Sequence, residues 1–195
     1  MFRVKESTPN RSKVAPKTRY QDYRNDLRND FNCSCGYCDD SDEFQDKSTF
    51  HIDHFAPKSK FPKLELVYDN LVYSCRFCNV AKSNKWVMKN HLVSHDGRRG
   101  FVDPCSNDYN SHIYRSPKGA ILPHTDLGNY MIKELNLGLI RHEYLWKARQ
   151  LRKKRLKLMQ LLEKLPRGSD GREEVLEAIV NLVEQYEKYF TWACR

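Results

Sequence analysis

Long apolar runs are missing from this 195-residue sequence, which contains no stretch of about eighteen apolar residues and is not expected to span a membrane. The first twenty residues, MFRVKESTPNRSKVAPKTRY, lack the apolar centre of a secretory signal, so we expect a cytoplasmic protein. There are no internal repeats. A chain of this length is expected to fold as one domain, or as one domain with an appendage.

Acidic residues are in the minority: 25 Asp and Glu stand against 34 Lys and Arg, which gives a formal net charge of +9. The basic residues crowd the first nineteen positions and the sequence RQLRKKRLK at 149–157. Such a charge suits an anionic partner. A solvated surface without a partner explains each basic run equally well.

Disulfides are not expected in a reduced compartment, so closely spaced cysteines indicate metal ligands. Cys35 and Cys38 form one Cys-x-x-Cys knuckle, and Cys75 and Cys78 form a second. Four thiolates in two such knuckles are typical of a structural zinc site, because each tight turn presents both sulfurs to one ion. Chance spacing and a redox pair are the alternatives. Cys33 offers a competing ligand beside Cys35, although the spacing favours Cys35.

The remaining cysteines, Cys105 and Cys194, stand alone and are expected to be packing residues.

Hydrophobic periodicity predicts an α+β protein in four parts. Residues 1–19 form a basic extended arm, and residues 20–100 hold a helix at 20–31, strands at 50–55 and 70–75, and a helix at 79–92. Residues 101–140 are expected to be an irregular wrapping segment. Residues 141–195 form an antiparallel helical hairpin with one basic helix and one Glu-rich helix. Asp170 and Glu173 have the spacing of a capping box for the second helix.

The first predicted strand carries three polar residues, His51, Asp53 and His54, which a strand built only for packing would not need. The stretch HIDHFAPKSKF, with YDNLVYSCRFCNVAK downstream, resembles the HNH nuclease family over residues 31–90. The resemblance implies a ββα-metal core fixed by the two zinc knuckles. It also implies hydrolysis of nucleic-acid phosphodiester bonds, leaving 5′-phosphate and 3′-hydroxyl ends.

The same resemblance implies roles for individual residues. His54 would be the general base, Asp53 and Asn79 would hold one Mg²⁺ or Mn²⁺ ion, and Asn70 would brace the loop that holds His54. Oxygen donors suit these ions, and zinc bound by four cysteines has no open position for chemistry. Asn79 is also well suited to cap a helix. His51 is either a further ligand or a structural residue.

Several nearby residues have two interpretations each. Four lysines lie beside the site, and each either contacts phosphate or is plain surface charge: Lys58, Lys60, Lys82 and Lys85. His91 and His95 have a metal-capable spacing, but we expect them to be structural. The protein as a whole is either a nuclease, a catalytically silent zinc-containing nucleic-acid binder, or a subunit whose hairpin docks a partner.

The flanking phrases FVDPCSNDY and ELNLG are similar to HNH proteins of Septu-type and retron-associated bacterial defence systems. That similarity implies an effector in anti-phage defence and an SMC-like ATPase as a partner. A stand-alone nuclease is the alternative.

Overall fold

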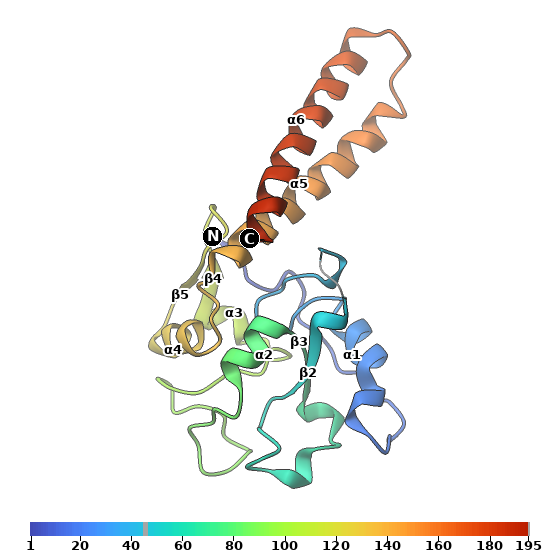
Figure 1. Cartoon of the computed structure of the whole chain (residues 1–195). Helices are drawn as coiled ribbons and strands as arrows, with labels where there is room; N and C mark the ends of the chain where they lie inside the picture. Colours follow the sequence, from blue (N-terminus) through green and yellow to red (C-terminus); the bar gives the residue numbers. More distant parts are fainter. Residues whose placement is uncertain (45–46, 195) are drawn as a thin grey trace. The chain divides into compact units, whose positions relative to one another are not determined.

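The structure is a computed structural model that describes residues 1–44 and 47–194, and the chain divides into two compact units, Met1–Gly138 and Leu139–Arg195. The first unit mixes helices and short strands, whereas the second consists of two long helices (Figure 1). This mixture confirms the predicted α+β class. Within the described residues, no helix combines the length and the apolar composition that crossing a membrane requires.

A two-stranded antiparallel sheet followed by a helix occupies the middle of the first unit. Strand β2 (Phe50–His54) pairs with β3 (Leu71–Cys75) so that Phe50 lies opposite Cys75 and His54 opposite Leu71. Helix α2 (Arg76–Lys82) begins directly after β3. All five residues of β3 are buried, as expected for a strand covered on both faces.

The predicted helix at 79–92 is wrong in both of its limits. Helix α2 starts three residues earlier, inside the second knuckle, and ends at Lys82, because Ser83 has a φ of 48° that interrupts the helical backbone. Beyond this point Trp86 turns into the core, where its ring meets the edges of Phe55 and Phe61. Burial of this one large aromatic side chain outweighs the helical propensity of the segment.

Residues 101–140 are more regular than expected. They contain α3 (Tyr109–His112), β4 (Ile113–Arg115), β5 (Ile121–Pro123) and α4 (Asp126–Glu134). Thr125 caps α4 by accepting a hydrogen bond from the Gly128 N–H. The strands are only three residues long, too short to show a hydrophobic period in the sequence.

The N-terminal segment takes part in this second sheet. Strand β1 (Phe2–Arg3) pairs with β4, which gives the strand order β1-β4-β5. Val4 and Lys5 are both buried directly after β1. The remainder of the first nineteen residues has no regular structure, and Arg11 forms a bidentate ion pair with Asp103.

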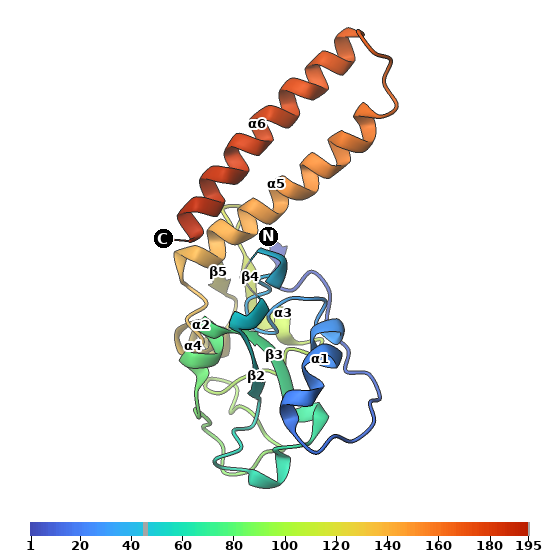
Figure 2. The ribbon, with the colours of Figure 1, turned by 45° about the vertical axis from the view of Figure 1, so that its right-hand side comes forward.

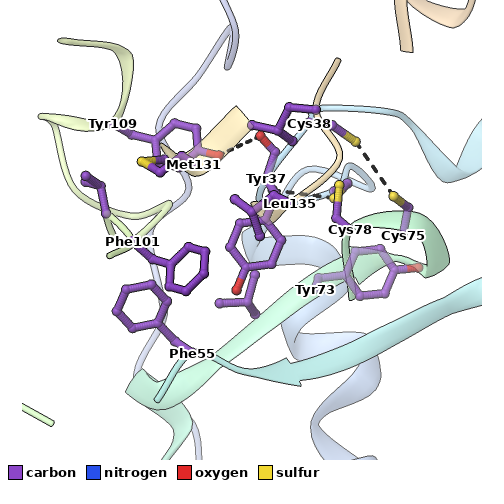
Figure 3. Close-up of a cluster of buried hydrophobic side chains, with 14 of the residues drawn as sticks. Tyr37, Cys38, Phe55, Tyr73, Cys75, Cys78, Phe101, Tyr109, Met131 and Leu135 are labelled. Atoms are coloured by element: carbon purple, nitrogen blue, oxygen red, sulfur yellow. Dashed lines mark hydrogen bonds between the residues drawn. The ribbon is translucent and has the colours of Figure 1, made fainter. Parts of the chain in front are cut away.

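The predicted helix at 20–31 is present as a 3₁₀ turn, η1 (Tyr20–Tyr23), followed by α1 (Arg24–Asp30). Further single 3₁₀ turns occur at Asp42–Phe44, Lys47–Thr49, Pro62–Leu64 and Tyr68–Asn70. The core of the unit packs the cysteines against aromatic side chains, including Tyr37, Tyr73, Phe101 and Tyr109 (Figure 3).

The second unit contains α5 (Ile140–Leu162) and α6 (Asp170–Ala193), which lie side by side in opposite directions (Figure 2). The predicted capping box of Asp170 and Glu173 is wrong, because α6 already begins at Asp170. Ser169 is the N-cap of α6, and its hydroxyl bonds to the Pro166 carbonyl instead of a helix N–H.

Candidate metal centre and HNH site

The four knuckle cysteines come together in the core although the two knuckles are far apart in the sequence. One ligand atom from each of Cys35, Cys38, Cys75 and Cys78 lies within 4.8 Å of all the others, and all four residues are buried. The Sγ atoms of Cys38 and Cys75 are 3.7 Å apart (Figure 3). A tetrahedral zinc ion with Zn–S bonds of about 2.3 Å places its sulfurs roughly 3.8 Å apart. The cluster can therefore bind a zinc ion.

Backbone and side-chain hydrogen bonds hold the first knuckle, Cys35–Cys38, in place. Lys5 Nζ donates to the Gly36 carbonyl at 2.7 Å, and Arg115 donates to the Cys38 carbonyl at 2.5 Å. The Gly36 N–H bonds to the Tyr73 carbonyl, which joins the first knuckle to β3. Burial raises the pKa of Cys78 well above its ordinary value, so an external cation is needed to keep its thiolate in this core.

The structure distinguishes Cys35 from its neighbour. Cys33 lies outside the cluster and is half-buried with a φ of 54°, as part of the turn that leads into the knuckle. Cys105 is also half-buried and Cys194 is exposed, and neither belongs to the cluster.

Asp53 lies in a buried polar network on the core side of β2. Its Oδ2 atom accepts a hydrogen bond from the Tyr37 hydroxyl at 2.5 Å and pairs with Lys82 Nζ at 2.9 Å. The Lys82 side chain is fully buried and also donates to the His54 carbonyl at 2.9 Å. Burial raises the pKa of Asp53, and Lys82 and Tyr37 offset part of that rise. This carboxylate therefore already has a cation of its own.

His54 ends the same strand, and its ring is held on two sides. Nε2 lies 3.0 Å from the Glu65 carbonyl, and the Tyr20 ring meets the imidazole edge-on at a centroid distance of 4.8 Å. A carbonyl can only accept, so Nε2 carries the proton of the neutral ring and Nδ1 is left as the acceptor. Burial lowers the pKa of His54, which favours the neutral form.

Asn70 holds the segment that follows His54. Its side-chain oxygen accepts from the Ala56 N–H at 2.8 Å, and its amide nitrogen donates to the Ala56 carbonyl at 3.0 Å. The Asn70 carbonyl also accepts from the Phe55 N–H. These bonds attach the chain after β2 to the start of β3.

Asn79 and His51 are less clearly connected to the site. Asn79 is half-buried within α2, whose N-cap is Cys75, so Asn79 is not the helix cap that one interpretation required. His51 pairs with Ser74 across the sheet, and burial, followed by the charges of Arg24 and Arg76, lowers its pKa. In the described part of the chain, no metal-sized group of three or more His, Cys, Asp or Glu includes His51 or Asp53.

Comparison with known proteins identifies the region that contains both groups of residues. Residues 35–85 match the HNH endonuclease family model. The match begins at the first knuckle, includes β2, β3 and α2, and suggests nuclease activity on a nucleic-acid substrate. Neither the curated proteins nor the solved structures contain a match to this chain.

Within this HNH region (residues 35–85), the four candidate phosphate-binding lysines all have internal partners. Lys82 is buried and cannot contact a substrate, which corrects its predicted role. Lys58 pairs with Glu65 and Lys85 with Glu134, each at 2.7 Å, and Lys60 donates to the Trp86 carbonyl. Only the last three are exposed.

His91 and His95 lie outside the HNH region and outside any helix, so the helical i, i+4 spacing does not apply to them. The His91 ring contacts Phe61, whereas the His95 ring lies near His112.

Sequence reasoning missed Tyr37 and assigned Lys82 to phosphate contact or surface charge instead of to Asp53. Tyr37 falls between the ligands of the first knuckle, and Lys82 is the last residue of α2. The positions of both residues in these motifs can be read from the sequence, but their contacts with Asp53 cannot.

Proposed function

We propose that the HNH region hydrolyses phosphodiester bonds of nucleic acid, with His54 as the general base. The observation that carries the proposal is the fixed imidazole, whose Nε2 is occupied by the Glu65 carbonyl while Nδ1 is left as a proton acceptor. A base for this step must be neutral near physiological pH, and the lowered pKa of His54 meets that requirement.

In the proposed reaction, His54 Nδ1 takes a proton from a water molecule as the water oxygen bonds to phosphorus. The bond between phosphorus and the leaving sugar oxygen breaks, and that oxygen takes a proton from solvent water to become a hydroxyl. The HNH resemblance implies that it is the 3′ oxygen. The Asn70 bonds to Ala56 and the Lys82 bond to the His54 carbonyl keep the base in one position during this step.

We further propose that Asp53 and Asn79 hold a Mg²⁺ or Mn²⁺ ion. A carboxylate and an amide are the hard oxygen donors that these ions prefer. Because Tyr37 and Lys82 occupy Oδ2 of Asp53, the ion would use the other carboxylate oxygen. When bound, it would polarise the phosphate as a Lewis acid. The four-cysteine site would hold a structural zinc ion.

Phosphate contact is proposed for Lys58, Lys60 and Lys85, which are exposed. Exposed ion pairs such as Lys58–Glu65 contribute little to stability, so these side chains can exchange partners. The roles in anti-phage defence and beside an SMC-like ATPase rest on the sequence resemblance alone and receive no support from the comparisons.

The test is cleavage of labelled DNA and RNA by the full chain with Mg²⁺ or Mn²⁺. His54→Ala should lower the rate by about 10²–10⁴ while the thermal melt and the zinc content stay unchanged. His91→Ala, a histidine outside the HNH region, serves as the control and should retain full activity. Equal activity in the His54→Ala and wild-type proteins would refute the role of His54. Binding without cleavage in the wild type would favour a silent binder.

A further inference from the structure

The helical pair exposes apolar side chains that its own packing does not use. Leu156 and Met159 on α5, and Leu176 and Val180 on α6, have exposed fractions between 43% and 57%. Apolar residues gathered on one surface are typical of a protein interface, whereas scattered ones need no explanation. Their arrangement on the two helices therefore decides what they indicate.

The seam between the helices is identified by its spacing. Residues at alternating steps of three and four are buried or half-buried on both helices, which is the heptad pattern of a two-helix interface. The seam residues are Ala148, Leu151, Arg155, Leu158 and Leu162 on α5, and Val175, Ile179, Leu182, Tyr186, Tyr189 and Ala193 on α6.

Each of the four exposed residues follows a seam residue by one position. In an antiparallel pair, positions that follow the seam by one lie on the same face of both helices. Leu156 and Met159 therefore share a face of the pair with Leu176 and Val180. We call this surface, defined by these four residues, the apolar face.

The antiparallel register also places these residues at one level along the helices. At one end the Tyr144 ring lies 5.3 Å from the Trp192 ring, and at the other Arg172 donates to the Leu162 carbonyl at 2.6 Å. Counting inward from both contacts sets Leu156 and Met159 beside Leu176 and Val180. The apolar face is therefore one continuous patch.

The charges of the two helices indicate which partner fits the patch. Helix α5 carries eight Lys or Arg and one Glu, a net charge of +7. Helix α6 carries two Lys or Arg and six Asp or Glu, a net charge of −4. A surface that is basic along one helix and acidic along the other is complementary to a second copy of itself.

We propose that two copies of this chain associate through the apolar face to form a four-helix bundle. The two-fold axis lies parallel to the helices, so that α5 of each copy packs on α6 of the other. A two-fold axis across the helices would instead place α5 of one copy on α5 of the other, so that two helices with a net charge of +7 each would repel one another. The parallel axis also brings the Leu156 level of one copy to the Val180 level of the other.

Sedimentation equilibrium of the full chain over a range of concentrations tests the association. The wild type should behave as a dimer of the 23.2 kDa chain. Leu156→Glu should raise the dissociation constant at least about tenfold, because it places a charge in the interface. The matched control is Leu161→Glu, since Leu161 is equally exposed (45% against 46%) but precedes a seam residue and lies on the opposite face. Circular dichroism should show unchanged helicity for both variants.

A chain that is monomeric at every concentration overturns the proposal, as does a dimer that both variants weaken equally. A monomer whose Leu156→Glu form loses a copurifying protein would assign the apolar face to a different partner, and would also overturn it.

The orientation has its own test. Carbodiimide links Lys to Glu in a mixture of ¹⁴N-labelled and ¹⁵N-labelled chains, and links of mixed isotope can form only between copies. Mixed links should join α5 lysines to α6 glutamates. Mixed links that join α6 to α6 would show that the two-fold axis runs across the helices.

Discussion

Both ends of the β2–β3 sheet bury groups that can carry negative charge, and the two ends differ in how that charge is compensated. At the Phe50–Cys75 end, four buried thiols face one another, and the buried cations Lys5 and Arg115 donate to the carbonyls of Gly36 and Cys38. At the His54–Leu71 end, the buried carboxylate of Asp53 is paired with the buried ammonium of Lys82. The four thiolates would need a metal ion bound to their sulfurs, whereas the Asp53 carboxylate is already paired with a side-chain cation.

This difference separates two uses of metal in one small region. Zinc at the cysteine end would be required for folding, because the thiolates cannot stay buried without it. A divalent ion at the Asp53 end would be required only for the reaction, because Lys82 keeps the carboxylate compensated in its absence. The following variants test this distinction.

The largest effect is expected from Cys75→Ser. Structural zinc contributes about 10–16 kcal/mol in model peptides, which is comparable with the whole stability of a domain of about 5–15 kcal/mol. We therefore expect the variant to lose zinc and the cooperative melt of residues 1–138. The control is Cys33→Ser, which alters a cysteine outside the cluster and should keep both. A Cys75→Ser protein with full zinc content and a normal melt would show that the cluster is not a metal site.

A smaller effect is expected from Lys82→Met, which leaves the Asp53 carboxylate buried without its cation. Loss of one partner of a buried ion pair costs about 3–5 kcal/mol, measured as the free energy of unfolding in urea. Zinc content should not change. Adding Asp53→Asn to Lys82→Met should recover most of the stability, because no charge is then left unpaired. Failure of the second substitution to recover any stability would show that Lys82 acts through another contact.

The smallest effect is expected from Asn70→Ala, which removes the bonds to both polar groups of Ala56. Leaving these buried groups unsatisfied should cost about 1–3 kcal/mol of unfolding free energy. Cleavage should slow as well, since His54 loses its support, while zinc content stays constant. Asp69→Ala, at an exposed neighbouring position, should be neutral in all three measurements. Zinc loss in Asn70→Ala would show that the two ends of the sheet are not independent.

The sequence was sufficient for the features that depend on local spacing. The two Cys-x-x-Cys knuckles, the strand at Phe50 and the helical pair each follow from a short repeat or a continuous stripe of residues. Each of these patterns is contained within one segment, so no knowledge of distant contacts was needed.

Features that depend on distant partners were not predictable in this way. Lys82 resembles any surface lysine until Asp53, on another element, is placed beside it. The end of α2 depends on Trp86 packing against Phe55 and Phe61. Helix propensity is a local property and does not reflect such tertiary contacts. Strands β1 and β4 are so short that only their pairing defines them.

Strand β1 precedes its partners Tyr114 and Arg115 by more than a hundred residues, so it leaves the ribosome well before they are made. Lys5, which supports the first knuckle, is held in place by the same strand. Completion of the first unit must therefore wait until β4 has been synthesised, even though all four cysteines are available earlier. A recombinant fragment trimmed to residues 35–85 would lack both strands and the bonds from Lys5 and Arg115 to the first knuckle, so we expect it to be less stable than the first unit.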